Sequence, residues 1–214
     1  MVTNAEYSAT VAEQLPDLPE ENIIGEPAIR NTAPCIGLAA LHIRRRAGNT
    51  MMTVLPADHF IPDNDTFIQC LKQCEETATH EGGFVMIGIK PTSPETGYGY
   101  IHVGDALMDG AHQVLGFREK PVRMMAEQFL MGGRHLWNSG MFVWSVDTIL
   151  SGLEKYCPTV YSGLIEWDDC WGTVDEPDHL KRIYTALPNI SMIMRYWKKR
   201  TAYSWSRERF PGVM

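Results

Sequence analysis

Short apolar runs alternate along this chain with stretches of helical periodicity, and this alternation limits the possible folds more than any other feature. Met51 to Leu55 is an apolar run of strand length, and Phe84 to Ile89 is the next one. Between them, apolar side chains recur at helical spacing, at Phe67, Cys70, Leu71, Cys74 and Ala78. The pattern predicts an α/β fold with a mostly parallel sheet flanked by helices.

Start and stop signals define the other predicted elements. Asp63 or Asp65 is predicted to cap the helix that carries Phe67. Thr32 is predicted to cap a helix that carries Pro34 in its first turn, where a proline is tolerated. The remaining elements are a helix from Pro121 to Gly132-Gly133, a strand from Trp137 to Trp144 and a helix from Val146 to Tyr156.

Charge and composition exclude several classes of protein. The 214 residues carry a formal net charge of −7, whereas a nucleic-acid binder needs a basic face, so no nucleic-acid partner is expected. No apolar run approaches the roughly 20 residues of a membrane helix. The opening MVTNAEYSAT has neither the basic region nor the apolar region of a secretory signal. The five scattered cysteines are odd in number, which favours structural thiols and a cytoplasmic protein.

Polar strings lie at predicted strand ends, where open α/β sheets bind their ligands. The string Leu55-Pro56-Ala57-Asp58-His59 places a carboxylate directly after a buried strand. Asp58 is then either the cap of a turn or a ligand of Mg²⁺, which takes one or two carboxylates together with substrate phosphates. Pro94 to Ile101 sets two glycines around Tyr98, which suits either an ordinary turn or close approach to a ligand.

Two further strings combine polar residues with predicted strands. Phe117 to Pro121 sets Glu119 beside Lys120, and as a solvated ion pair the two would contribute little energy. Trp137-Asn138-Ser139-Gly140-Met141 inserts small hydrogen-bonding residues into an apolar strand. Core strands seldom carry such residues without a reason, so this string favours a functional interpretation.

Together with Glu26-Pro27 and Asn31-Thr32-Ala33-Pro34, these strings resemble, in content and order, the GDP-forming mannose-1-phosphate guanylyltransferases. That family is a branch of the sugar-1-phosphate nucleotidyltransferases, and the resemblance covers residues 1–192. It implies a Rossmann-like nucleotide-diphospho-sugar transferase fold. It also implies an enzyme that converts GTP and mannose 1-phosphate to GDP-mannose and pyrophosphate, in which the protein contributes positioning and charge neutralisation.

The resemblance implies a role for each motif residue. The residues implied to bind the guanine and ribose of GTP are Glu26, Pro27, Asn31 and Thr32. Asp58 is implied to be catalytic and to hold Mg²⁺, the expected cofactor, and Lys120 is implied to grip the sugar phosphate as the second catalytic residue. The residues implied to contact the sugar are Gly97, Tyr98, Gly99, Glu119, Asn138, Ser139 and Gly140. A homo-oligomer is left open.

Two departures from the family pattern qualify this expectation. The family begins with a strand and a glycine-rich loop that wraps the triphosphate, whereas this chain starts at a point that matches a later strand. Residues 193–214 carry six basic residues and one acidic residue. A one-base change of reading frame near Met192 would convert the sequence that the family has after this point into the residues seen here. The same change would remove an aspartate that is the family's second metal ligand. We therefore expect residues 193–214 to be a frame-changed tail that does not pack, and the chain alone to make no GDP-mannose.

Two other functions compete with this expectation. One is another sugar-1-phosphate nucleotidyltransferase, which uses glucose 1-phosphate with UTP or dTTP. The other belongs to a different class, a non-catalytic subunit that binds a sugar nucleotide. An exchange of nucleotides in an assay distinguishes the first alternative, and the DNA around this frame bears on the second.

Overall fold

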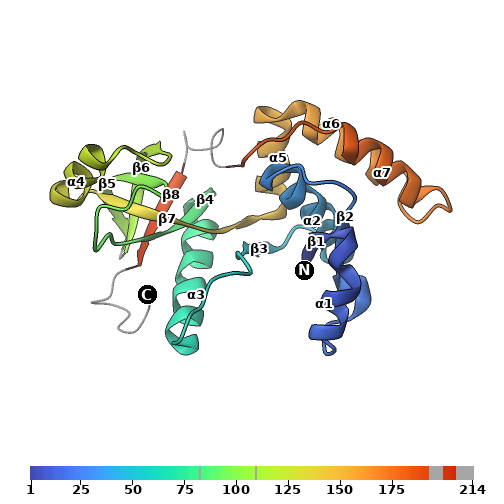
Figure 1. Cartoon of the computed structure of the whole chain (residues 1–214), viewed down its shortest axis with the longest axis horizontal. Coiled ribbons are helices and arrows are strands. Elements are labelled where there is room, and N and C mark those ends of the chain that lie inside the picture. Colours follow the sequence, from blue (N-terminus) through green and yellow to red (C-terminus); the bar gives the residue numbers. More distant parts are fainter. Residues whose placement is uncertain (82, 109, 193–199, 206–214) are drawn as a thin grey trace. The chain divides into compact units, whose positions relative to one another are not determined.

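The computed structural model describes residues 1–81, 83–108, 110–192 and 200–205 of the chain. These residues form two compact units (Figure 1). The first comprises Met1–Thr50 and residues 149–192, and the second comprises Met51–Thr148 and residues 200–205. The nucleotidyltransferase domain predicted over residues 1–192 stays a prediction, because these units do not test its bounds.

The first unit combines helices with a two-stranded parallel sheet, in which β1 pairs with β2. Its elements are β1 (Val2–Asn4), η1 (Ala5–Tyr7), α1 (Ser8–Gln14), η2 (Glu20–Asn22), β2 (Ile24–Glu26), α2 (Thr32–Ala47), α6 (Pro158–Asp168) and α7 (Glu176–Ala186). The helix α5 (Val146–Tyr156) has the predicted bounds, and its residues from Ile149 onward belong to this unit.

Helix α2 packs closely against α6. A Cβ atom on Gly37 would lie 2.5 Å from Leu164 Cδ1, so the missing side chain permits this approach. At the end of α2, Arg44 and Arg45 form ion pairs with the Asp168 carboxylate at 3.1 and 2.6 Å. Asn31 caps α2, since its Oδ1 accepts from the Thr32 N–H at 2.8 Å, and the predicted cap Thr32 is instead the first helical residue.

The second unit is built on a six-stranded sheet with the order β3-β7-β4-β8-β6-β5, in which β7 also pairs with β5. Its strands are β3 (Met51–Val54), β4 (Phe84–Ile89), β5 (Tyr100–Met108), β6 (Ala111–Arg118), β7 (His135–Ser145) and β8 (Arg200–Trp205). Its other helices are α3 (Asn64–Glu81) and α4 (Arg123–Gly132).

The predicted α/β class is confirmed, but the predicted strand direction is not. Within the described part of the six-stranded sheet, β4 and β8 are parallel, and the other pairings are antiparallel. The long strand β7 causes most of this difference, because it runs antiparallel to β3, β4 and β5. An apolar run buried on both faces has the same sequence pattern in either direction.

The strand β8 departs from the expectation that residues 193–214 do not pack. Residues 200–205 lie between β4 and β6, parallel to the first and antiparallel to the second (Figure 1). The expectation is therefore wrong for these six residues, and the remainder of the segment lies outside the described residues. The frame-change hypothesis stays a prediction for the DNA sequence.

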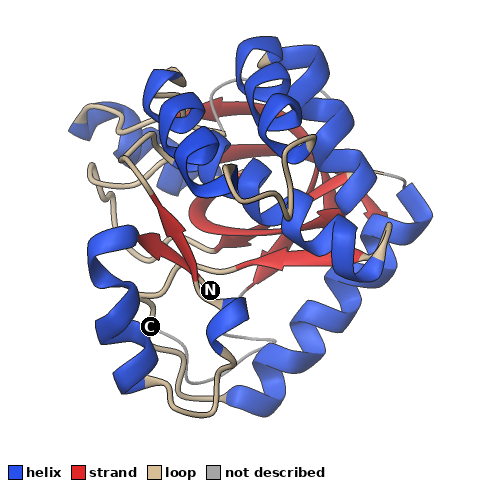
Figure 2. Ribbon diagram, turned by 90° about the vertical axis from the view of Figure 1, so that its right-hand side faces the viewer, coloured by secondary structure: helices blue, strands red, loops and turns tan. Residues whose placement is uncertain are grey.

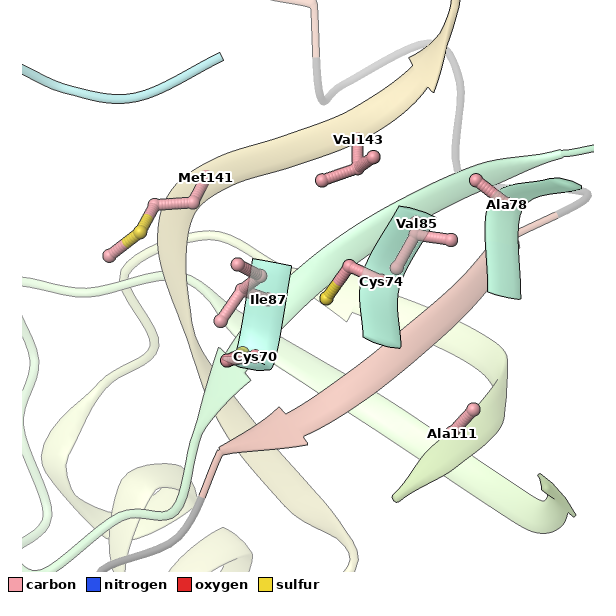
Figure 3. Packing of buried hydrophobic residues seen from close by; sticks show 8 residues of the cluster. All are labelled: Cys70, Cys74, Ala78, Val85, Ile87, Ala111, Met141 and Val143. Carbon is pink, nitrogen blue, oxygen red and sulfur yellow. The ribbon is translucent and has the colours of Figure 1, made fainter. Parts of the chain in front are cut away.

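The core of the second unit lies between α3 and the sheet. Cys70, Cys74 and Ala78 project from one face of α3 toward Val85 and Ile87 of β4 (Figure 3). The cluster also contains Ala111, Met141 and Val143. Both cysteines are fully buried free thiols, which agrees with their four-residue spacing in the sequence. Asp63 caps α3, because its Oδ1 accepts from the Thr66 N–H at 3.0 Å.

Helices and strands both form a large part of the chain, as the ribbon diagram shows (Figure 2). Helix α3 spans 18 residues and carries charged residues along its length. No helix in the described ranges has both the length and the apolarity needed to cross a membrane.

Candidate functional site

In the first unit, Glu26 ends β2, and two side chains from other elements hold its half-buried carboxylate. The Tyr184 hydroxyl of α7 donates to Glu26 Oε1, and the Cys35 thiol of α2 also hydrogen-bonds to the carboxylate. Burial raises the pKa of Glu26, while the two hydrogen bonds act in the opposite direction. Burial and the neighbouring carboxylate raise the pKa of Cys35 to about 12, so at neutral pH the thiol remains a donor.

The other predicted nucleotide residues follow in the loop between β2 and α2. Pro27 is half-buried, whereas Asn31 and Thr32 are exposed. Asn31 has φ 66° and ψ −171°, a conformation that glycine adopts almost exclusively. The Thr32 hydroxyl accepts a hydrogen bond from the Met192 N–H at 2.9 Å. This loop is thus held in a strained conformation by contacts with distant parts of the chain.

In the second unit, three of the predicted strings meet at one row of the sheet. Tyr100 of β5 pairs with Arg118 of β6 on one side and with Trp137 of β7 on the other. The Asn138 N–H donates to the Gly99 carbonyl at 2.8 Å. A Cβ atom on Gly99 would lie 2.9 Å from Glu119 Oε2. Gly99, Glu119 and Asn138 therefore lie together in the second unit.

The residues beside this row are exposed. Tyr98 is 51% exposed, and its ring packs edge-on against Trp137 with the centroids 5.3 Å apart. Gly97 has no atom within 4 Å of an added Cβ position. Lys120 is exposed and has φ 40°, although a residue that precedes proline normally adopts an extended conformation.

The Asn-Ser-Gly string forms an irregularity in β7. Met86 pairs with Phe142 and Gly88 with Asn138, so that Ile87 alone faces the three residues from Ser139 to Met141. The buried Ser139 hydroxyl donates to the Ile87 carbonyl at 2.6 Å and accepts from the Met141 N–H at 3.2 Å. Gly140 has φ 73°, and its N–H lies 3.3 Å from Asn138 Oδ1. The serine and the glycine thus have a structural role in this bulge.

Removal of the Ser139 hydroxyl should destabilise the second unit. We expect Ser139→Ala to lower the free energy of unfolding by about 1–3 kcal/mol, because two buried backbone groups lose their partner. Thermal unfolding measures the loss. Ser93→Ala is the control, since the Ser93 hydroxyl bonds the Glu95 carboxylate at an exposed site and its loss should cost less than about 0.5 kcal/mol. Equal losses in both variants would contradict the structural role of Ser139.

Asp58 lies on an exposed turn in the loop that follows β3. A Cβ atom on Gly140 would lie 3.2 Å from Pro56 Cγ, so the loop that carries Asp58 abuts the bulge in β7. Across the described residues, no three or more His, Cys, Asp or Glu side chains gather in a group that could hold a metal ion. Asp58 therefore belongs to no such group among the described residues.

The described residues with positive φ that are not glycine are Asn31 and Lys120. Both are also candidate site residues of the sequence strings. Such conformations cost about 1–3 kcal/mol each and cluster at active sites and ligand-binding loops. The backbone geometry thus marks one candidate residue in each unit independently of the motifs.

The sequence missed four residues that support these sites. Tyr184 and Cys35 contact Glu26, and Phe117 and Trp137 pack on Gly99 and Tyr98. Phe117 and Trp137 stand inside the recognised strings, so their neighbours could have indicated them. Tyr184 is 158 residues from Glu26, and no local pattern indicates this contact.

The chain is similar to known proteins in both sequence and structure. A family model described as nucleotidyl transferase matches residues 1–164. Mannose-1-phosphate guanylyltransferases of Klebsiella pneumoniae and Escherichia coli are 46% and 45% identical over 165 residues, which is 75% of this chain and 35% of each relative. The chain thus spans about a third of their length. A Thermus thermophilus structure described as mannose-1-phosphate geranyltransferase has a TM-score of 0.82 and 27% identity, over 95% of this chain and 57% of that one.

Proposed function

The chain belongs to the nucleotidyl transferase family, and from that premise we propose that it serves the synthesis of GDP-mannose and pyrophosphate from GTP and mannose 1-phosphate. In this proposal the first unit recognises the guanine nucleotide and the second unit recognises the sugar phosphate. The names of the relatives that are 45–46% identical support this choice of substrates.

The observation that carries the proposal is the strained backbone at Asn31 and Lys120. Glycine adopts both conformations without strain, and folding does not need the exposed side chain of Lys120, whereas the Asn31 side chain also caps α2. A side chain retained at the position of Lys120 therefore indicates a requirement other than stability. Lys120 supplies a cation, and Asn31 supplies an amide beside Thr32, which suits a phosphate and a nucleoside, respectively.

The second unit offers the groups that a sugar phosphate needs. Glu119 and Lys120 are exposed and adjacent, and the Glu119 carboxylate lies beside Gly99. In the proposed complex, Glu119 accepts from sugar hydroxyls, and Lys120 binds the phosphate as a point charge. Gly97, Tyr98 and Gly99 contact the sugar ring, and Asn138, Ser139 and Gly140 border it. The exposed edge of Tyr98 suits such a contact.

The first unit offers a carboxylate for the base. Guanine presents two adjacent N–H donors on one edge, and an ionised carboxylate accepts from both. Glu26 is half-buried at the end of β2, so water would weaken its hydrogen bonds to a ligand less than at an exposed site. In the proposed complex, Pro27 and Thr32 also contact the nucleotide. Adenine lacks this pair of donors, and a desolvated carboxylate would reject it.

Asp58 is the proposed ligand of Mg²⁺. The exposed carboxylate on the turn after β3 fits an ion that takes one or two carboxylates and otherwise phosphate and water. When bound, the ion neutralises phosphate charge. The protein then contributes the placement of the two reactants, and an effective concentration gained in this way accounts for much of the rate in such transfers.

The proposal is tested by the ligand preferences of the 214-residue chain. Calorimetric titrations with mannose 1-phosphate and glucose 1-phosphate, and with GTP and UTP, are compared in the presence of Mg²⁺. We expect the chain to bind mannose 1-phosphate and GTP at least about tenfold more tightly than their counterparts, since one unpaired polar group costs about 1–3 kcal/mol. Equal affinity within both pairs would overturn the assignment.

A further inference from the structure

The Glu26 carboxylate is held from two sides by residues outside its own strand. Tyr184 is completely buried in α7, and its hydroxyl donates to Glu26 Oε1. Cys35 lies in the first turns of α2 and hydrogen-bonds to the same carboxylate. A buried tyrosine hydroxyl needs a partner, and here the partner is an ionisable side chain rather than a backbone carbonyl.

The loop and the helix that bear these groups are tied together. Arg30 donates to the Tyr184 carbonyl at 3.4 Å and also to the Thr185 carbonyl, at the end of α7. After α7, the Ile190 N–H donates to the Arg30 carbonyl at 3.3 Å, and the Ile190 carbonyl accepts from the Ala33 N–H at 3.0 Å. The position of the Tyr184 hydroxyl relative to the loop from Glu26 to Thr32 is therefore fixed.

A glutamate at the end of a three-residue strand has little else to fix its side chain. Ordering a free glutamate on binding costs up to about 1.5–2 kcal/mol of rotamer entropy. A carboxylate already oriented by a hydrogen bond loses less on binding and presents its acceptors in one direction. Tyr184 thus supplies the order that β2 does not.

We propose that Tyr184 is a positioning residue for base recognition, which orients the Glu26 carboxylate toward the guanine donors and keeps it ionised, with Cys35 as the second donor. This inference rests on the proposed role of Glu26 and adds the residues that make the carboxylate selective. Neither supporting residue belongs to the strings that carry the resemblance, and Tyr184 lies beyond the residues matched by the family model.

The electrostatics of the cluster agree with this role. Burial raises the pKa of Glu26, and the hydrogen bonds from Tyr184 and Cys35 lower it. Without the Tyr184 hydroxyl, the pKa of Glu26 should rise further, so the carboxylate becomes protonated at a higher pH. Burial, together with the hydrogen bond to Glu26 and its negative charge, raises the pKa of Tyr184 against a smaller opposite effect of Arg30, so the hydroxyl remains a donor. A protonated Glu26 presents a donor where guanine also presents donors.

The test compares the affinities of the full chain for guanosine and adenosine 5′-monophosphates, at neutral and at mildly acidic pH. Tyr184→Phe removes the hydroxyl alone. We expect the preference for guanine to fall about tenfold at neutral pH and to disappear at a higher pH than in the unaltered chain. Tyr161→Phe on α6 is the matched control, and it should change neither the preference nor its pH dependence. Cys35→Ala should change the preference for guanine and its pH dependence in the same direction as Tyr184→Phe.

The outcomes separate this inference from the proposed function. If the unaltered chain prefers guanine and Tyr184→Phe keeps both the preference and the pH profile, Tyr184 is structural, and the positioning role is overturned. If the unaltered chain shows no preference for guanine, the role of Glu26 fails, and this inference fails with it. If Tyr184→Phe does not fold, which circular dichroism reveals, Cys35→Ala decides by the same two measurements.

Discussion

Replacement of Lys120 by glycine should weaken the binding of mannose 1-phosphate about 10- to 100-fold, because a charge-assisted hydrogen bond contributes about 1.5–3 kcal/mol. The same substitution should stabilise the folded chain. Lys120 has φ 40°, which glycine adopts without strain, and we expect a gain of about 1 kcal/mol, or a rise in Tm of about 2–4 °C. Calorimetric titration and thermal unfolding measure the two effects on one variant.

Two further variants separate charge from backbone conformation at this position. Lys120→Ala removes the cation but keeps a side chain at positive φ, so it should lose affinity and gain no stability. Lys72→Ala removes an exposed lysine from α3 and should leave the affinity unchanged. If Lys120→Gly bound mannose 1-phosphate as tightly as the unaltered chain, the phosphate role of Lys120 would be lost. If it unfolded at a lower temperature, the conformation would not be strained.

A methyl group added at Gly99 should destabilise the second unit more than one added at Gly97, the other glycine of the string from Pro94 to Ile101. The new Cβ would lie 2.5 Å from Phe117 Cζ and 2.9 Å from Glu119 Oε2, closer than van der Waals contact allows. The ring and the carboxylate must therefore shift. We expect Gly99→Ala to cost about 1–3 kcal/mol of stability and to weaken mannose 1-phosphate binding at least about tenfold, since Glu119 is displaced.

Gly97→Ala is the matched control for this substitution. It adds the same methyl group two residues earlier, where no atom lies within 4 Å of the new Cβ. Gly97→Ala should change the stability by less than about 0.5 kcal/mol. Thermal unfolding and titration with mannose 1-phosphate are measured on both variants. If the two variants had similar stabilities and affinities, the close contact at Gly99 would not be the reason for a glycine at this position.

The two predictions rest on different relations between stability and ligand binding. Lys120 tolerates an unfavourable φ, and Gly99 gives up a side chain so that Phe117 and Glu119 can approach the backbone. Lys120 therefore differs from the residue that stability alone would favour, whereas glycine at position 99 is also the residue that the packing of Phe117 requires. Ser139 differs from Lys120 in the same way, because its hydroxyl completes two backbone hydrogen bonds and therefore has a sufficient structural reason.

The sequence alone determined the elements that local spacing specifies. The strand Phe84–Ile89 and the helix Val146–Tyr156 have the predicted bounds, and Cys70, Cys74 and Ala78 lie on the buried face of α3. These features depend on the periods of a helix and a strand and on caps such as Asp63, all of which act within a few residues. The sequence also located the candidate sites, because their residues lie in short strings.

Only the tertiary structure decided how these elements pair. The antiparallel course of β7 beside β3, β4 and β5 and the place of β8 between β4 and β6 involve residues far apart in the chain. The sequence of an apolar run does not indicate whether its strand pairs in parallel or antiparallel, since side chains alternate in the same way in both cases. The contact of Tyr184 with Glu26 likewise spans 158 residues. Hydrogen bonds of this kind are set by the packing of α7, which no local pattern encodes.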